Sequence, residues 1–308
     1  MTDAKSTFSA RLRDAADRVE SMLVALLGDD ARDGEIARPQ RLMQAMRHGA
    51  LAGGKRLRPF LAIEAARMLG ATGDGPLRAG VSIELVHCYS LVHDDMPAMD
   101  DDDLRRGKPT VHKAYDDATA ILVGDALQTL AFEVLADPAT HEDGAVRAGL
   151  ILGLARASGL GGMVGGQMLD LAAEGRYGER VLSQADIRTL QAMKTGAILA
   201  FSAEAGAIIA GAGADVRARL LAYGKALGAA FQIADDILDR EASAEDLGKA
   251  VGKDAALGKG TLVDALGMDG ARAECARLVD EARDALSPFG ADAAVLIEAA
   301  RFTVARKN

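Results

Sequence analysis

The chain of 308 residues is poor in cysteine, which forms disulfide bonds, and in aromatic residues, which stack on other rings. It contains no tryptophan, only 4% aromatic residues and two cysteines, Cys88 and Cys275. Two cysteines make no disulfide framework, and neither has a partner at metal-ligand spacing. The composition therefore favours a protein of the reducing cytoplasm.

Positive charge is also in short supply. Lys and Arg number 36 against 45 Asp and Glu, which gives a formal net charge of −9 and a sequence pI near 5.1. Proteins that bind nucleic acids usually carry a basic surface and aromatic stacking residues. We therefore expect no nucleic-acid partner.

Long apolar runs are missing as well. Residues 1–12 lack the apolar core of a secretion signal. The longest nearly uncharged stretch, 197–214, is interrupted by Glu204 and is shorter than the roughly 20 apolar residues of a membrane span. We expect a soluble, cytoplasmic protein without a transmembrane segment, in which this stretch forms a packed core helix.

Helical periodicity is what the sequence does contain. With 49% hydrophobic residues the chain can bury a large core, and no segment alternates apolar and polar residues as a strand would. This pattern predicts an all-α fold, a single domain over 1–308 with a mobile loop near 243–260. We expect helices over 8–26, 39–52, from 59 onward, 77–95, 114–135, 144–173, 185–210, 216–239, 270–286 and 291–305.

The first concentration of chemistry is a run of six aspartates between Asp94 and Asp103. Pro97 should end the preceding helix near Asp95, which leaves carboxylates at a helix C-terminus, where the macrodipole disfavours them. Hard cations such as Mg²⁺ would remove that penalty. A solvated acidic turn explains the run equally well. An EF-hand is excluded, because the twelfth position counted from Asp94 is Arg105.

A second acidic cluster lies near the C-terminal end of the chain. Helix geometry puts Gln232, Asp235, Asp236 and Asp239 on one face, at i, i+3, i+4 and i+7. The preceding residues 227–233 are nearly all apolar, so this helix should be buried and its acids should face a cavity. The alternative is a solvated face of a surface helix.

Basic residues occur in several separate places. The run 53–59 combines two glycines with Lys55, Arg56 and Arg58, which suits phosphate binding or a basic turn between helices. Further candidates are Arg105 and Arg106 after the first cluster, Lys194 with Thr195 in an apolar helix, Lys249 in the expected loop, and His87 on the helix face of Asp94.

Five elements in this order resemble the trans-isoprenyl diphosphate synthases, and most closely the bacterial farnesyl diphosphate synthases. They are residues 53–59, residues 87–106, Gly166-Gln167 with Asp170, Lys194-Thr195, and residues 231–239 followed by Lys249. The resemblance implies the isoprenoid synthase fold, a helical bundle around a central cavity, and a homodimer.

The resemblance also implies roles for the individual residues. A cluster of three Mg²⁺ ions would be held by Asp94, Asp100 and Asp235. The allylic diphosphate would be bound by Arg105, Lys194 and Lys249. Isopentenyl diphosphate would be bound by Lys55, Arg58, His87 and Arg106. Thr195 and Gln232 would place oxygen atoms near the developing cation, and Tyr89, with Ser90 beside it, would close the prenyl pocket.

The implied activity is that of a farnesyl diphosphate synthase, which joins isopentenyl diphosphate to dimethylallyl and then geranyl diphosphate. Geranyl and geranylgeranyl diphosphate remain alternative products. A class I terpene cyclase would need no second basic site, a non-catalytic partner subunit would lack an aspartate in one cluster, and an acidic cation-binding scaffold would not bury Asp235 and Asp239.

Overall fold

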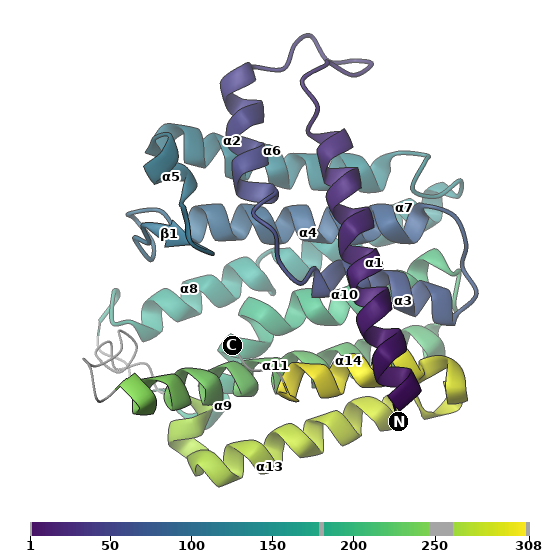
Figure 1. Ribbon diagram of the computed structural model, residues 1–308, viewed down its shortest axis with the longest axis vertical. Helices are drawn as coiled ribbons and strands as arrows, with labels where there is room; N and C mark the ends of the chain where they lie inside the picture. Colours follow the sequence, from purple (N-terminus) through teal and green to yellow (C-terminus); the bar gives the residue numbers. More distant parts are fainter. Residues whose placement is uncertain (1, 179–181, 247–260, 306–308) are drawn as a thin grey trace.

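The computed structural model describes residues 2–178, 182–246 and 261–305, and it shows a helical bundle, as predicted (Figure 1). The α-helices are α1 (Thr2–Leu26), α2 (Gln40–Ala50), α3 (Leu57–Met68), α4 (Gly75–Asp94), α5 (Val111–Ala114), α6 (Asp117–Ala136), α7 (Gly144–Ser158), α8 (Met163–Ala173), α9 (Gln184–Gln191), α10 (Ala197–Ile209), α11 (Ala214–Asp246), α13 (Leu262–Ala285) and α14 (Ala294–Ala305). A π-helical turn, η1 (Ala192–Gly196), joins α9 to α10, and a 3₁₀ helix, η2 (Ser287–Ala293), precedes α14.

Three details differ from the sequence-based expectations. The helix expected over 144–173 is two helices, because Gly159 and Gly162 adopt backbone conformations outside the helical region. A two-residue hairpin, β1 (Leu104–Arg105) and β2 (Lys108–Pro109), follows the acidic run. Residues 243–246 continue α11 rather than starting a loop. The rest of the expected loop, with Lys249, lies outside the described residues.

Small residues let the central helices approach one another closely. A Cβ atom on Gly224 of α11 would lie 2.6 Å from the Cα of Ala200 on α10, and one on Gly228 would lie 3.0 Å from the Cα of Gly196. Nearly every side chain of α10 is buried, so the apolar stretch beginning at residue 197 is a packed core helix, as expected. One apolar cluster joins residues from α1 through α14.

By length and composition alone, three apolar stretches could cross a membrane. They cover Asp117–Ala136, Gly144–Ala173 and Gln184–Ile209, and 50%, 33% and 67% of their apolar windows are buried inside the protein. The second stretch is interrupted by the turn between α7 and α8. All three supply buried side chains to the helical core, which accounts for much of their apolar character.

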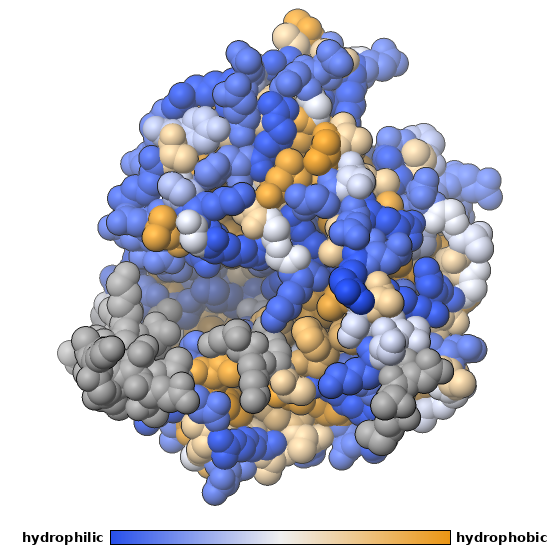
Figure 2. Space-filling view, in the orientation of Figure 1, coloured by the Kyte–Doolittle hydropathy of each residue, from blue (hydrophilic) through white to orange (hydrophobic). Residues whose placement is uncertain are grey.

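The chain order brings the predicted motifs to one end of the bundle. Helices α4, α8 and α11 all have their C-terminal ends at the left of Figure 1. Asp94 is the last residue of α4, Asp170 lies in the last turn of α8, and Asp235 lies in the C-terminal half of α11. In the same orientation Figure 2 shows the surface hollowed at this end, with hydrophilic residues around the opening. The bundle therefore collects its acidic motifs around a recess.

Candidate active site

Two adjoining cavities occupy this end of the molecule. The first has a volume of about 500 Å³ and the second about 540 Å³, and both are lined by Arg58, His87, Leu91 and Thr195. The first is mainly apolar and also includes Tyr89, Ser90, Asp94, Met163, Gln167 and Lys194. The second is rich in cations and also includes Lys55, Arg105, Arg106, Phe231 and Gln232. The shared residues make the two cavities neighbouring parts of one site.

The two aspartates at the end of α4 point in different directions. Asp94 lines the apolar cavity, where burial, and to a lesser extent Asp100, raises its pKa to about 6 although Lys194 opposes the shift. The backbone N–H of Asp100 donates to the carbonyl oxygen of Asp94 at 2.9 Å, so the two residues are adjacent. Asp95 is buried away from this cavity and is bound by the guanidinium of Arg105. The first motif therefore divides into a cavity-facing and an ion-paired aspartate.

Lys194 is held in place by a buried acid on α8. Its Nζ lies 2.6 Å from Oδ2 of Asp170, which is only 7% exposed. Lys194 and Thr195 both belong to the π-helical turn, a local departure from α-helix that is frequent at functional sites. Gly166 of α8 allows this turn to approach, because a Cβ atom there would overlap the backbone of Lys194. Lys194 and Thr195 therefore both line the cavity from the π-helical turn η1.

The second acidic cluster is not a single exposed face. Gln232 lines the cationic cavity, and the charge of Asp235 acts on Arg58, so both lie on the cavity side of α11. Asp236 instead accepts a hydrogen bond from Nε2 of Gln191 at 3.0 Å and one from the backbone N–H of Leu262. Burial raises the pKa of Asp236 to about 6. Neighbouring acids on one helix face thus have different partners.

Arg58 and His87 form the junction of the two cavities. Burial lowers the pKa of Arg58, and its Nε is buried without a hydrogen-bond partner. Within the described residues Arg58 makes no ion pair. Burial, together with the positive charge of Arg58 and Arg106, lowers the pKa of His87 well below its usual range, so this imidazole is neutral at pH 7. Lys55 is exposed, with Nζ 5.5 Å from the ring centroid of Phe302.

Arg56 differs from its two basic neighbours because it is part of the core. It is 4% exposed, and its guanidinium lies 2.7 Å from Glu84, itself 3% exposed, and 2.8 Å from Glu20. It also donates to the carbonyl oxygen of Ala50 at 2.8 Å. The basic run 53–59 therefore contains one structural cation between two that face the site.

Arg105 and Arg106 both line the cationic cavity but already have protein partners. Arg105 bonds Asp95 and lies 3.4 Å from Asp102, so most of its guanidinium is engaged. Arg106 adopts a left-handed backbone conformation, with φ at 53°, and donates to the carbonyl oxygen of Gly53. The short hairpin that carries them is what turns both side chains back toward the site.

Tyr89 and Ser90 also line the apolar cavity. The Tyr89 ring packs edge to face with His93 at a centroid distance of 5.9 Å, and burial raises its pKa to about 12. Its buried hydroxyl makes no well-formed hydrogen bond, although Gln128 lies beside it. Ser90 donates to the carbonyl oxygen of His87 at 2.9 Å. Asp94 and Tyr89 lie about 140° apart around α4. Both side chains nevertheless line the same cavity.

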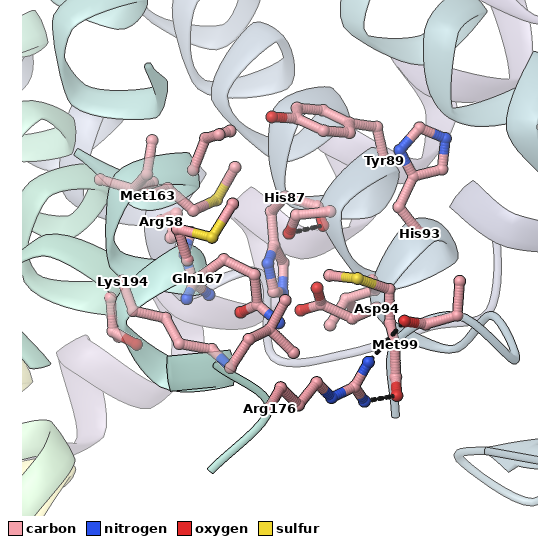
Figure 3. A pocket seen from close by; sticks show the side chains of 18 of the residues that line it. Arg58, His87, Tyr89, His93, Asp94, Met99, Met163, Gln167, Arg176 and Lys194 are labelled. Atoms are coloured by element: carbon pink, nitrogen blue, oxygen red, sulfur yellow. Dashed lines mark hydrogen bonds between the residues drawn. The ribbon is translucent and has the colours of Figure 1, made fainter. Parts of the chain in front are cut away.

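Sequence reasoning missed Arg176, and it gave Gln167 no role in binding. Both side chains point into the apolar cavity, beside Asp94 (Figure 3). The Nε2 atom of Gln167 is buried without a partner. Arg176 follows α8 in an irregular segment, where no periodicity indicates its direction. Only the motif that contains Gln167 could have drawn attention to this part of the cavity.

Comparison with known proteins agrees with this geometry. The family model described as polyprenyl synthetase matches residues 39–286. Farnesyl diphosphate synthase of Escherichia coli is 44% identical over 80% of this chain and 81% of its own length. A large subunit of heterodimeric geranylgeranyl pyrophosphate synthase from Arabidopsis thaliana is 40% identical over 89% of this chain and 74% of its own length.

A solved structure shows the same arrangement of helices. The FPP/GFPP synthase of Zymomonas mobilis, an apo structure, is 43% identical and superposes with a TM-score of 0.87 over 98% of this chain and 100% of that chain. The chain therefore belongs to the polyprenyl synthetase family. The predicted all-α isoprenoid synthase fold and prenyltransferase function are confirmed.

Proposed function

We propose that the protein joins isopentenyl diphosphate to dimethylallyl diphosphate and then to geranyl diphosphate, with farnesyl diphosphate as the product. One observation carries this proposal: an apolar cavity that contains Asp94 and Lys194 adjoins a cavity that contains Lys55 and Arg58. A terpene cyclase binds one diphosphate and needs only the first cavity. A reaction between two diphosphate substrates needs both.

Three Mg²⁺ ions held by Asp94, Asp100 and Asp235 are part of this proposal. Within residues 2–178, 182–246 and 261–305, no three His, Cys, Asp or Glu side chains converge as a preformed metal site. Mg²⁺ characteristically takes one or two carboxylates and completes its shell with water and substrate phosphate. The partly buried carboxylate of Asp94 beside Asp100 fits that mode. The bound ions would neutralise the diphosphate as it leaves the allylic carbon.

The side chains of this protein would perform the remaining tasks. Lys194, fixed by Asp170, would contact the allylic diphosphate and stabilise its growing negative charge. Lys55, Arg58 and the neutral imidazole of His87 would donate to isopentenyl diphosphate.

The allylic cation that forms when the diphosphate leaves needs protection from water. The product of its addition to isopentenyl diphosphate must then lose a proton. The apolar walls of the first cavity would exclude water that would otherwise consume the cation. Thr195 and Gln232 would direct oxygen atoms toward it. Among the described residues, His87 and Asp94 line these cavities but are assigned here to substrate and metal binding, so we assign removal of the final proton to the released diphosphate.

An assay with purified protein tests this function. Incubation with labelled isopentenyl diphosphate, geranyl diphosphate and Mg²⁺ should give a C15 prenyl diphosphate and release inorganic diphosphate. Cyclic hydrocarbons formed without isopentenyl diphosphate would instead identify a cyclase. Binding of Mg²⁺ without any turnover would identify a non-catalytic scaffold, and a C10 or C20 product would select one of the alternative chain lengths.

The C15 product depends on Tyr89 as the end of the prenyl pocket. Substituting Tyr89→Ala removes a buried ring from the cavity wall, so the main product should become longer than C15. Product analysis by reversed-phase chromatography measures this. The matched control is Tyr177→Ala, because Tyr177 borders the same cavity but is 64% exposed, and its product should stay C15. An unchanged product of the Tyr89 variant would rule out the proposed pocket end.

We also propose that the protein is a cytoplasmic homodimer. Large hydrophobic side chains are exposed on two successive helices, namely Ile121 and Leu122 of α6 and Leu152 of α7. Both cysteines are buried free thiols, which suits a reducing compartment. Light scattering at micromolar concentration should give twice the chain mass of 32.0 kDa, and a mass equal to that of one chain would contradict the dimer.

A further inference from the structure

Arg176 connects the end of α8 to the turn between the aspartates of the first motif. Its Nη1 donates to the carbonyl oxygen of Ala98 at 2.6 Å, and its Nη2 donates to the carbonyl oxygen of Met99. Its Nε lies 3.3 Å from a carboxylate oxygen of Glu174. Figure 3 shows the guanidinium directed at this turn, beside Asp94. All three nitrogen atoms of the guanidinium therefore have a protein partner.

Several backbone N–H groups of the turn bond to nearby carbonyl groups of the same segment, whereas the carbonyl groups of Ala98 and Met99 accept from Arg176. The N–H groups of Met99 and Asp101 donate to the carbonyl oxygen of Met96 at 2.8 and 3.1 Å. The N–H of Asp100 donates to the carbonyl oxygen of Asp94 at 2.9 Å. Asp101 has a left-handed φ of 50°, so the turn is tight. Within the described residues, Arg176 supplies the donors to the carbonyl groups of Ala98 and Met99 at the tip of the turn.

The contact between Arg176 and the turn bears on the repulsion between two nearby carboxylates. Asp94 and Asp100 carry like charges at the two ends of the turn, so in the absence of cations they repel each other. A guanidinium bound to the carbonyl groups of Ala98 and Met99 fixes the backbone between the two carboxylates, and so opposes the movement by which they would separate. Hydrogen bonds from an ionised donor are also stronger than neutral ones.

We infer that Arg176 is a positioning residue that holds the turn 96–101 against α8, so that Asp100 stays beside Asp94 before any metal binds. This inference rests on the proposed function in so far as Asp94 and Asp100 are metal ligands. Arg176 borders the cavity, but its nitrogen atoms are committed to Ala98, Met99 and Glu174. It therefore acts on substrate through the turn and not by direct contact.

Hydrogen exchange of the metal-free protein tests the inference without substrate. The backbone amides of residues 99–102 should exchange about tenfold or more faster in Arg176→Ala, because two charge-assisted hydrogen bonds are lost. Arg176→Lys keeps the charge but cannot bond both carbonyl groups in the same way, so its exchange should be intermediate. Arg277→Ala is the matched control, since Arg277 makes ion pairs on the surface of α13, and should leave this exchange unchanged.

Steady-state kinetics supply the second measurement. In Arg176→Ala the Mg²⁺ concentration for half-maximal activity should rise roughly tenfold, while the KM for isopentenyl diphosphate stays the same. Unchanged amide exchange in both Arg176 variants would overturn the inference, as would an increase confined to the KM of the allylic substrate. If the wild-type chain has no prenyltransferase activity and the variants still exchange faster, the positioning role stands and the proposed function fails.

Discussion

Replacing Asp94 with asparagine should stabilise the metal-free protein while removing its activity. Burial raises the pKa of Asp94 from 3.8 to about 6, so the folded protein holds a proton there more tightly than the unfolded chain. Stability therefore falls as the pH rises from about 4 to about 6, and above pH 6 the full penalty is present. Asparagine has nearly the same shape and carries no charge.

At pH 7 we expect the free energy of unfolding to increase by about 1–3 kcal/mol. The upper figure follows from the size of the pKa shift, and the lower figure allows for solvent screening and structural relaxation around the carboxylate. Urea denaturation in the presence of a chelator measures it. The gain should disappear only below about pH 3, which is under the unfolded pKa of 3.8, because there the wild-type carboxyl is protonated in the folded and the unfolded state. Because a metal ligand is lost, kcat should fall by at least about 10²-fold, and Mg²⁺ should stabilise the wild-type protein more than the variant.

Asp101→Asn is the control, because Asp101 belongs to the same acidic run and asparagine tolerates its left-handed backbone. Its stability and activity should stay close to those of the wild type. If Asp94→Asn were less stable than the wild type at pH 7 without metal, the carboxylate would be making a favourable contact, and its assignment as a metal ligand under electrostatic strain would be wrong.

Substituting Arg56→Met should destabilise the protein by about 3–5 kcal/mol, because it leaves the buried carboxylate of Glu84 without its partner. Chemical denaturation measures this loss. The double substitution Arg56→Met with Glu84→Leu should recover much of it, since removing both charges leaves none unpaired in the core. A double variant no more stable than the single one would show that the two residues are not coupled.

Lys55→Met is the matched comparison for Arg56. Lys55 is the adjacent cation in the sequence but is exposed, so its removal should change stability by less than about 1 kcal/mol. It should instead raise the KM for isopentenyl diphosphate. The two neighbouring substitutions would then separate a cation that stabilises the fold from one that binds substrate.

Much of the architecture followed from local patterns in the sequence. The end of α4 near Asp95 was predicted from Pro97. The start of α9 has an equally local cause, a capping box formed by Ser183 and Asp186. These features depend on residues a few positions apart, so they can be judged without knowing the fold. The division between α7 and α8 was missed because Gly159 and Gly162 lie inside an apolar run that continues on both sides.

The candidate site was predicted in its residue types but only partly in its contacts. Asp94, His87 and Lys194 line the apolar cavity. Helix geometry also placed Asp236 with Asp235, yet Asp236 turns to Gln191 on another helix. Periodicity defines the face of a helix, but it does not say which neighbour packs against each edge of that face.

The sequence by itself determined the all-α fold, the two acidic motifs and the family, because these depend on composition, periodicity and order along one chain. Only the tertiary structure decided which of three adjacent cations, Lys55, Arg56 and Arg58, is buried against Glu84. It alone also brought Arg176 to the turn of the first motif. The reason is physical: burial and ion pairing depend on helices that are distant in sequence, and their relative positions are set by packing of the whole core.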